Sequence, residues 1–203
     1  MLKLENKIYE SGYNKIACID EVGRGCLAGD VLACAIVMPR GLQIDGVKDS
    51  KKLSQKKREF LYDKIIENCI AYGIGRVSPK VIDKINIKES TRLAMKFAVQ
   101  NLKDHKENLV LPDYLLIDAE EIDLNIHYDS IIKGDEKSHG IGCASIVAKV
   151  YRDRLCFEWD KKYNGYNLKK HKGYGTKEHR EYIKNLGPSE IHRMSFLKKI
   201  LNS

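Results

Sequence analysis

Residues 16–29 have the sequence IACIDEVGRGCLAG, and the rest of the chain is organised around them. The apolar residues 16–19 are typical of a buried strand, and two adjacent carboxylates, Asp20 and Glu21, follow directly. Acids at the end of a buried strand are costly unless a partner compensates them, and a divalent cation is a suitable partner because hard cations prefer oxygen ligands. Taken alone, the pattern Asp-Glu-x-Gly-x-Gly is equally compatible with a surface turn that carries solvated acids.

The segments on either side predict an α/β domain whose mixed β-sheet is flanked by helices. A second apolar run, 31–38, predicts an antiparallel partner for the first strand, and further strands are expected at 70–77, 114–117 and 131–132. Helices are expected over 54–68, from Ser78-Pro79 onward, over 88–105, over 138–160 and from Thr176 to Gly187-Pro188, which we expect to be the last regular helix. Phe60 and Phe97 are expected on the buried faces of two of these helices. Residues 1–14 are interpreted as a short lead-in and residues 15–203 as a single domain.

Length and composition narrow the class of protein. The chain has 203 residues, of which 43% are hydrophobic, so we expect one globular domain with a substantial core. Lys and Arg number 36 against 28 acids, and a net charge of +8 favours a polyanionic partner such as nucleic acid. No apolar run approaches the length of a membrane span, and the polar N-terminus does not resemble a signal peptide, so we expect a cytoplasmic protein. The six cysteines form no C-x-x-C pair, which argues against a zinc site.

The motifs together resemble the ribonuclease HII family, the type 2 ribonucleases H. Asp-Glu-Val-Gly-Arg-Gly followed by Leu-Ala-Gly matches the family signature, and further family blocks follow at suitable spacing: KDSKKL at 48–53, LID at 116–118, KGD at 133–135, ASIVAK at 144–149 and HKGYGT at 171–176. The match runs from about residue 15 to residue 196. The resemblance implies the ribonuclease H-like fold with a helical C-terminal portion. It also implies hydrolysis of the RNA strand of RNA–DNA hybrids, and incision of DNA 5′ of embedded ribonucleotides to leave 5′-phosphate and 3′-hydroxyl ends.

Four carboxylates carry the implied chemistry. Residue by residue, the resemblance assigns catalysis and metal binding to Asp20, Glu21, Asp118 and Asp135, with two Mn²⁺ or Mg²⁺ ions flanking the scissile phosphate. The local pattern agrees, because Asp20 and Asp118 each end an apolar strand, where open α/β sheets place their active sites. Asp135 follows a glycine and precedes a helix, so it can approach from the side. For Asp118 taken alone, a helix or turn cap is the alternative.

A second group of residues is expected to contact nucleic acid. The turn Gly23-Arg24-Gly25 lets backbone groups come close to a sugar, and the resemblance implies that it recognises the ribose 2′-hydroxyl, with Arg24 on a phosphate. A plain tight turn is the alternative. Tyr174, flanked by glycines, can stack on a sugar or base, with a core tyrosine as the alternative. Three lysines, Lys51, Lys52 and Lys149, are candidate phosphate contacts or members of a solvated face.

The remaining polar residues are expected to be structural. Glu120, Glu121 and Asp123 are expected to be solvated, and Asp153 to form helix-surface ion pairs. Ala119 stands where the family commonly has glycine, which suggests a slightly different backbone there. His171, His179 and His192 are scattered in the sequence without metal-binding spacing, and Trp159 is expected in the core.

Three rival functions are weighed against a ribonuclease HII. A ribonuclease HIII-type enzyme needs an additional N-terminal domain, which residues 1–14 are too few to supply. A DNA endonuclease or resolvase of the same fold class does not need a turn that recognises a 2′-hydroxyl. A non-catalytic nucleic-acid-binding protein of this fold has no use for four carboxylates, which would repel phosphate. The expected substrates are RNA–DNA hybrid and DNA containing ribonucleotides, without membrane association, and nothing requires more than a monomer.

Overall fold

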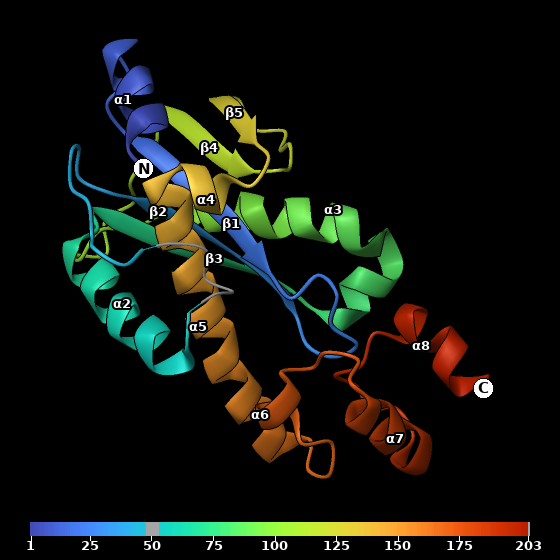
Figure 1. Cartoon of the computed structure of the whole chain (residues 1–203). Coiled ribbons are helices and arrows are strands. Elements are labelled where there is room, and N and C mark those ends of the chain that lie inside the picture. The colour runs from blue at the N-terminus through green and yellow to red at the C-terminus, as the bar shows by residue number, and fades with distance from the viewer. Residues whose placement is uncertain (48–52, 203) are drawn as a thin grey trace.

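The computed structural model describes residues 1–47 and 53–202 and has a five-stranded mixed sheet at its centre (Figure 1). The strands lie in the order β3-β2-β1-β4-β5. Their bounds are β1 Ile16–Val22, β2 Val31–Val37, β3 Ala71–Val77, β4 Tyr114–Asp118 and β5 His127–Ile131. β1, β2 and β3 pair antiparallel, whereas β4 and β5 run parallel to β1. The predicted α/β fold and the antiparallel first pair are therefore confirmed.

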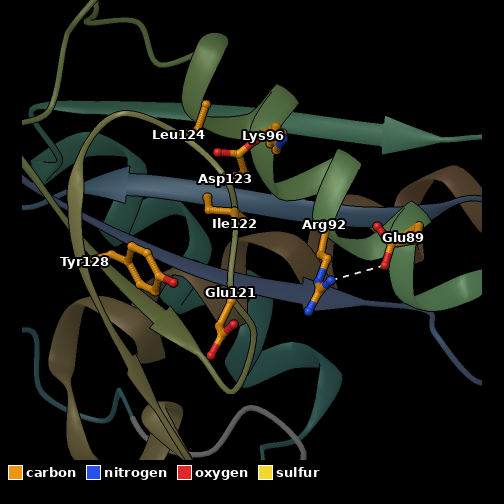
Figure 2. A pocket seen from close by; sticks show the side chains of 8 residues that line it. All are labelled: Glu89, Arg92, Lys96, Glu121, Ile122, Asp123, Leu124 and Tyr128. Carbon is orange, nitrogen blue, oxygen red and sulfur yellow. Dashed lines mark hydrogen bonds and ion pairs between the residues drawn. The ribbon is translucent and has the colours of Figure 1, made fainter.

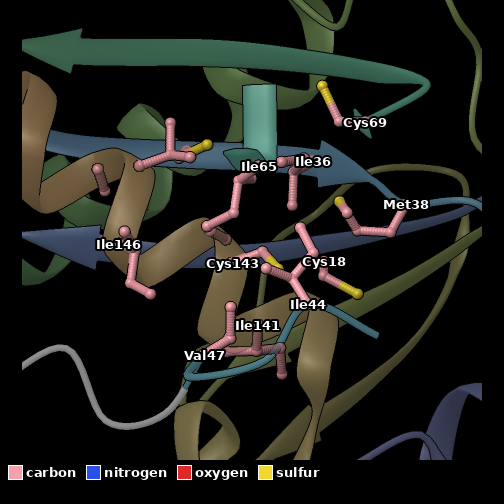
Figure 3. Close-up of a cluster of buried hydrophobic side chains, with 14 of the residues drawn as sticks. Cys18, Ile36, Met38, Ile44, Val47, Ile65, Cys69, Ile141, Cys143 and Ile146 are labelled. Atoms are coloured by element: carbon pink, nitrogen blue, oxygen red, sulfur yellow. The ribbon is translucent and has the colours of Figure 1, made fainter. Parts of the chain in front are cut away.

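Helices cover both faces of the sheet (Figure 1). Their bounds are α1 Lys3–Glu10, α2 Gln55–Asn68, α3 Pro79–Gln100, α4 Gly134–Lys137, α5 His139–Lys162, α6 Leu168–His171, α7 Lys177–Leu186 and α8 Met194–Leu201. Successive side chains of a strand point to opposite faces, so Cys34 of β2 packs in the cluster with α2 and α5 while Ala35 packs against α3. Figure 3 shows the first of these clusters, where Cys18 and Ile36 of the sheet meet Ile65 of α2 and Cys143 of α5.

The packing of α3 against the sheet depends on two glycines in β3. A Cβ at Gly75 would lie 1.9 Å from the carbonyl oxygen of Ala94, and one at Gly73 would lie 2.3 Å from that of Ala98. α3 therefore approaches the backbone of β3 more closely than any side chain would permit. The glycines also explain why residues 70–77 alternate poorly in the sequence although they form a strand.

Capping residues predicted where several of the helices begin. Ser54, Ser138 and Thr176 each accept a hydrogen bond from a first-turn amide of α2, α5 and α7, respectively. The two helices expected after Ser78 form one element, α3, interrupted at Asn86 (φ 67°), whose side chain accepts hydrogen bonds from the amides of Lys88 and Glu89.

Four of the sequence expectations about helices were wrong. Phe60 and Phe97 are 51% and 38% exposed rather than buried. α3 ends at Gln100 rather than near residue 105, and α8 follows the helix that was expected to be the last. No helix in the described part of the chain combines the length and apolarity that a membrane span requires.

Residues 1–14 are packed onto the start of α5. The buried carboxylate of Glu5 accepts hydrogen bonds from the Ser138 hydroxyl (2.7 Å) and the Gly140 amide (3.0 Å), and the amide of His139 donates to the carbonyl of Met1. Met1 and Glu5 therefore supply acceptors to amides in the first turn of α5, which would otherwise lack partners.

The C-terminal helices form a third cluster together with the loop between β1 and β2. Leu27 and Ala28 of that loop pack with Ile183 of α7 and Leu197 of α8. Trp159, expected in the core, is partly buried at the border of this cluster. The loop is also joined to the C-terminal segment by isolated backbone bridges, Cys26 with Tyr174 and Ala28 with His192. Residues far apart in the sequence thus build one wall around the end of β1.

Candidate active site

Three of the four carboxylates predicted from the sequence line one cleft near the carboxyl ends of β1 and β4. The parallel register pairs Ile19 with Ile117, so Asp20 and Asp118 come next on neighbouring strands. A cleft of about 210 Å³ opens here, lined by Asp20, Glu21, Val22, Gly23, Arg24, Gly25, Asp118, Ser145, Lys149 and Tyr174. The structure therefore brings three of the four predicted acids, the Gly-Arg-Gly turn, Lys149 and Tyr174 to one place.

Asp135 lies next to this cleft without lining it. It is 6% exposed and lies in α4, directly after Gly134, whose amide donates a 2.7 Å hydrogen bond to Oδ1 of Asp118. The backbone next to Asp135 is thus hydrogen-bonded to the carboxylate of Asp118. Lys51 and Lys52 lie outside the described residues.

The acids at the cleft disfavour one another's ionisation. Burial raises the pKa of Asp20 well above its usual range, and the neighbouring Glu21 and Asp118 raise it further, against a hydrogen bond with the Ser145 side chain. Burial raises the pKa of Glu21 to about 7; Arg24 opposes this rise, while Asp118 and Glu120 add to it. A site in which ionisation is this unfavourable is one that positive charge would stabilise.

The donor set suits a hard divalent cation. Carboxylate oxygens are the ligands that Mg²⁺ and Mn²⁺ prefer. Across residues 1–47 and 53–202, however, no three His, Cys, Asp or Glu side chains converge closely enough to hold an ion. The acids are turned toward partners of their own: Asp118 accepts from the Gly134 amide, and Oε1 of Glu21 lies 3.6 Å from the Arg24 guanidinium.

The two glycines of the Gly-Arg-Gly turn differ in whether the structure requires a glycine at their position. Gly23 has φ +90°, and a Cβ there would lie 2.3 Å from Nε of Arg152, so packing requires glycine. A Cβ at Gly25 would meet nothing within 4 Å, and its φ is not positive, so neither packing nor backbone conformation requires glycine there. Since Gly25 lines the cleft, the space above it is open to an external group.

Two buried arginines hold this turn from below, and the sequence analysis did not single them out. Arg152 donates to the carbonyls of Ala28 (3.1 Å), Asp30 (3.2 Å) and Lys172 (2.8 Å). Arg193 donates to the carbonyl of Gly29 twice and to that of Arg24 (2.8 Å). Both guanidiniums are fully buried, and among the described residues no carboxylate forms an ion pair with either. They fix both walls of the cleft through backbone carbonyls.

One signal for Arg152 was available in the sequence. Ala144, Ala148, Arg152 and Cys156 recur every four residues along α5, and all four are buried. The apolar face of the predicted helix therefore continued through Arg152. Arg193 had no comparable local signal, because it lies outside regular structure, immediately before α8.

Tyr174 and Lys149 both line the cleft, but Tyr174 is partly exposed whereas the ammonium of Lys149 is engaged in an ion pair. Tyr174 is 39% exposed, its backbone bridges Cys26, and burial raises the pKa of its hydroxyl to about 12. The ammonium of Lys149 is bound to Asp153, which also lies 3.7 Å from the Arg58 guanidinium. Asp153 was expected on the helix surface, but it is 3% exposed, because α2 packs over this turn of α5.

The three histidines that are scattered in the sequence lie together in the structure. The rings of His171 and His179 stack with centroids 4.1 Å apart, and Nε2 of His179 lies 3.2 Å from Nε2 of His192. Nδ1 of His179 donates to the Tyr174 carbonyl, so its Nε2 accepts from His192, whose Nδ1 accepts from the Ser189 amide. Burial lowers the pKa of His179 and of His192 to about 4, and both are neutral. Their ring nitrogens are already used to position the Tyr174 loop.

The segment after Asp118 also differs from expectation. Ala119 adopts φ +49°, the left-handed region that glycine favours, so the backbone turns there as it would with glycine. Glu120, expected in solvent, is 7% exposed and pairs with two arginines. Glu121 and Asp123 are exposed as expected and line a separate hollow of about 490 Å³, with Arg92, Lys96 and Tyr128 around it (Figure 2).

The chain is similar to several known proteins. The family model of ribonuclease HII matches residues 17–199. Ribonuclease HII of Alkaliphilus oremlandii is 60% identical over 200 residues, 98% of each chain. Among solved structures, ribonuclease H2 from Pyrococcus horikoshii OT3 is 26% identical with a TM-score of 0.75, over 93% of this chain and 98% of that one. Bst-RNase HIII in complex with Mn²⁺, 15% identical with a TM-score of 0.67 over 96% of this chain and 71% of that one, shares the fold. Since the family match includes every residue that lines the cleft, this chain belongs to the ribonuclease HII family.

Proposed function

We propose that this ribonuclease H-type endonuclease hydrolyses the RNA strand of RNA–DNA hybrids and nicks DNA on the 5′ side of an embedded ribonucleotide. The products would carry 5′-phosphate and 3′-hydroxyl ends. The observation that carries the proposal is Gly25, a glycine that the protein's own packing does not require, at the open side of a cleft lined with acids. A ligand that needs the space above Gly25 would explain why a glycine stands there. A ribose that approaches the backbone of the turn is such a ligand.

The carboxylates are proposed to hold divalent ions, Mn²⁺ or Mg²⁺. Asp20, Glu21, Asp118 and Asp135 would be the ligands, and their raised pKa values and mutual repulsion support this role. Mn²⁺ in Bst-RNase HIII, which has the same fold, is further support. When bound, such ions activate an attacking water and stabilise the leaving 3′ oxygen. The Gly134 amide orients Asp118 and the Ser145 side chain bonds to Asp20, so the protein itself fixes both acids.

Recognition of the substrate is proposed for the walls of the cleft. Gly23, Arg24 and Gly25 would contact the ribose 2′-hydroxyl and its phosphate, and Tyr174 would stack on the adjacent sugar. Lys51, Lys52 and Lys149 are proposed phosphate contacts, and Lys149 would exchange its bond to Asp153 for one to phosphate. We also propose a monomeric, cytoplasmic protein made of one catalytic domain.

The position of the cut tests the function. A duplex with one central ribonucleotide should be cut on the 5′ side of that residue, whereas duplexes with 2′-O-methyl ribose or deoxyribose at the same position should remain intact. The reason is that a turn that grips the 2′-hydroxyl beside the acids fixes the phosphate on one side of the ribose. Gel mapping with end-group analysis measures the outcome. Cutting of the all-DNA duplex, or a 2′,3′-cyclic phosphate end, would contradict the proposal.

Gly25→Ala supplies a matched variant for this experiment. The fold has space for the added methyl group, so the unfolding temperature should not change. Cleavage of the ribose duplex should fall, because the methyl group occupies the space proposed for the sugar.

Tyr174→Ala should weaken cleavage at a single ribonucleotide more than cleavage of a long hybrid. Stacking on a base or sugar contributes about 1–3 kcal/mol, so a loss of roughly tenfold or more is expected on the single-ribonucleotide duplex. A long hybrid offers many registers, so one lost stacking contact matters less there. Steady-state kinetics on both substrates checks this, and an equal loss on the two would argue against recognition of the junction by Tyr174.

A further inference from the structure

Glu120 is a buried acid held between two arginines. Its Oε1 lies 3.0 Å from Nη1 of Arg24, and its Oε2 lies 3.4 Å from Nε of Arg92. The side chain is 7% exposed, so these interactions are much less screened by solvent than those of a surface pair. Glu120 does not line the cleft, but it contacts the guanidinium of Arg24, which does.

The backbone is strained where it turns Glu120 inward. Ala119 has φ +49°, and its amide donates to the carbonyl of Ile131. A non-glycine residue in the left-handed region costs roughly 1–2 kcal/mol, and such strain persists only where the surroundings impose it. The turn directly follows Asp118. The end of β4 therefore places Asp118 at the cleft and Glu120 in contact with Arg24.

Arg24 lies between two acids with different roles. Its Nη1 is 3.0 Å from Glu120 and 3.6 Å from Oε1 of Glu21, which is a proposed metal ligand. If Glu120 lost its charge, Glu21 would remain as the acid nearest to Arg24. The guanidinium would then move onto Glu21 and neutralise the carboxylate that the proposed cations need. Its side chain is 40% exposed, so it is free to make that movement.

Arg92 balances the charge of Glu120 from the other side. It reaches from α3 to Glu120 and also lies 3.1 Å from Oε1 of Glu89, the contact drawn in Figure 2. Glu120 therefore shares its two carboxylate oxygens between Arg24 and Arg92.

We propose that Glu120 is a positioning residue, which holds Arg24 at the cleft, where it contacts the phosphate next to the ribose, and limits its contact with Glu21 to the 3.6 Å approach seen here. This inference rests on the proposed function and adds a residue to it. A merely repulsive acid near the substrate would behave oppositely, because removing it would strengthen the binding of any nucleic acid.

A double-mutant cycle tests the proposal. Glu120→Gln should lower kcat/KM on the single-ribonucleotide duplex about ten- to hundredfold, the range expected for loss of a hydrogen bond between charged groups. In the Arg24→Ala background, the same change should have almost no effect, because Glu120 acts through Arg24. Fluorescence anisotropy in EDTA measures duplex binding separately: Glu120→Gln should weaken binding of the ribose duplex and of the all-DNA duplex alike, because both carry the phosphate, whereas loss of a merely repulsive acid would strengthen both.

Glu121→Gln is the matched control. It removes the same charge from the next residue, which is exposed, and should leave kcat/KM and the preference for ribose unchanged. Glu120→Asp, which keeps the charge but shortens the side chain, should give an intermediate loss and serves if Glu120→Gln does not fold.

The outcomes separate this inference from the function on which it rests. If the wild-type protein does not cut the ribose duplex, the proposed function fails. If the wild-type protein cuts it and Glu120→Gln cuts equally well, only the role of Glu120 fails. Equal losses with and without Arg24 would also overturn that role, since Glu120 would then act independently of Arg24.

Discussion

Asp118→Asn should lower the rate of cleavage of a ribonucleotide-containing duplex by on the order of 100- to 1,000-fold, the scale seen when one electrostatic contact to a transition state is removed. Asparagine keeps the shape of the side chain and the oxygen that accepts the Gly134 amide, so the local structure should persist. It removes the negative charge, and with it a proposed metal ligand. Duplex binding should change little, because it depends mainly on Lys and Arg contacts to phosphates. Single-turnover cleavage and anisotropy measure the two effects.

Asp123→Asn is the control for this substitution. Asp123 has a fully exposed side chain in the same segment and should tolerate the change without loss of activity. An Asp118→Asn protein that cuts at the wild-type rate in Mg²⁺ or Mn²⁺ would remove Asp118 from the proposed site.

The same substitution should have a second effect in the absence of metal. Burial, with a smaller contribution from the charge of Asp118, raises the pKa of Glu21 to about 7, so Glu21 ionises less readily when folded than when unfolded, where its value is near 4.5. The free energy of unfolding should therefore fall as the pH rises from about 4.5 to about 7. Asp118→Asn should lower the pKa of Glu21 and reduce this fall, which NMR titration and denaturation in EDTA would detect.

Arg152→Met should destabilise the fold by about 3–5 kcal/mol and abolish most cleavage. The apolar side chain fills similar space but leaves the carbonyls of Ala28, Asp30 and Lys172 without their donor. Each unsatisfied buried polar group costs about 1–3 kcal/mol, part of which is offset because a buried charge is also removed. The expected decrease in Tm is roughly 6–20 °C for a chain of this size. Thermal denaturation of the metal-free protein measures it.

Arg154→Met, two residues further along the same helix, is the matched control. Arg154 is 49% exposed and pairs with Glu59 at the surface, so its loss should cost at most about 1 kcal/mol. Equal destabilisation by the two substitutions would contradict the role given to the carbonyl contacts of Arg152.

The parts of the fold that local patterns encode were predictable. Buried strands appear as apolar runs, and helix starts are marked by Ser54, Ser138 and Thr176, because capping depends on neighbours within one turn. Asp20 and Asp118 could be placed at one sheet edge because each ends a predicted strand, and the family blocks named the same acids. The structure then brought Asp20, Glu21, Asp118 and Tyr174 to one cleft.

Contacts between distant segments could not be predicted in this way. Glu120 and Asp153 appear as surface acids in the sequence because arginines that contact them, Arg92 and Arg58, belong to helices that are distant along the chain. The histidines meet only because α6, α7 and the segment before α8 pack together. Phe60 and Phe97 show the opposite error, since aromatic character alone does not decide on which side of a helical stripe a residue falls.

The bond between the Arg193 guanidinium and the Arg24 carbonyl has a consequence for the order of events during protein synthesis. It joins residues 169 positions apart, so at roughly 5–20 residues per second the ribosome needs on the order of 10–30 s to make the second partner after the first. During that interval the sheet can form, but the Gly-Arg-Gly turn lacks the hydrogen bond from Arg193 to the Arg24 carbonyl. A nascent chain should therefore acquire its fold before it acquires its activity, and a partly made enzyme should leave the nucleic acid around it uncut.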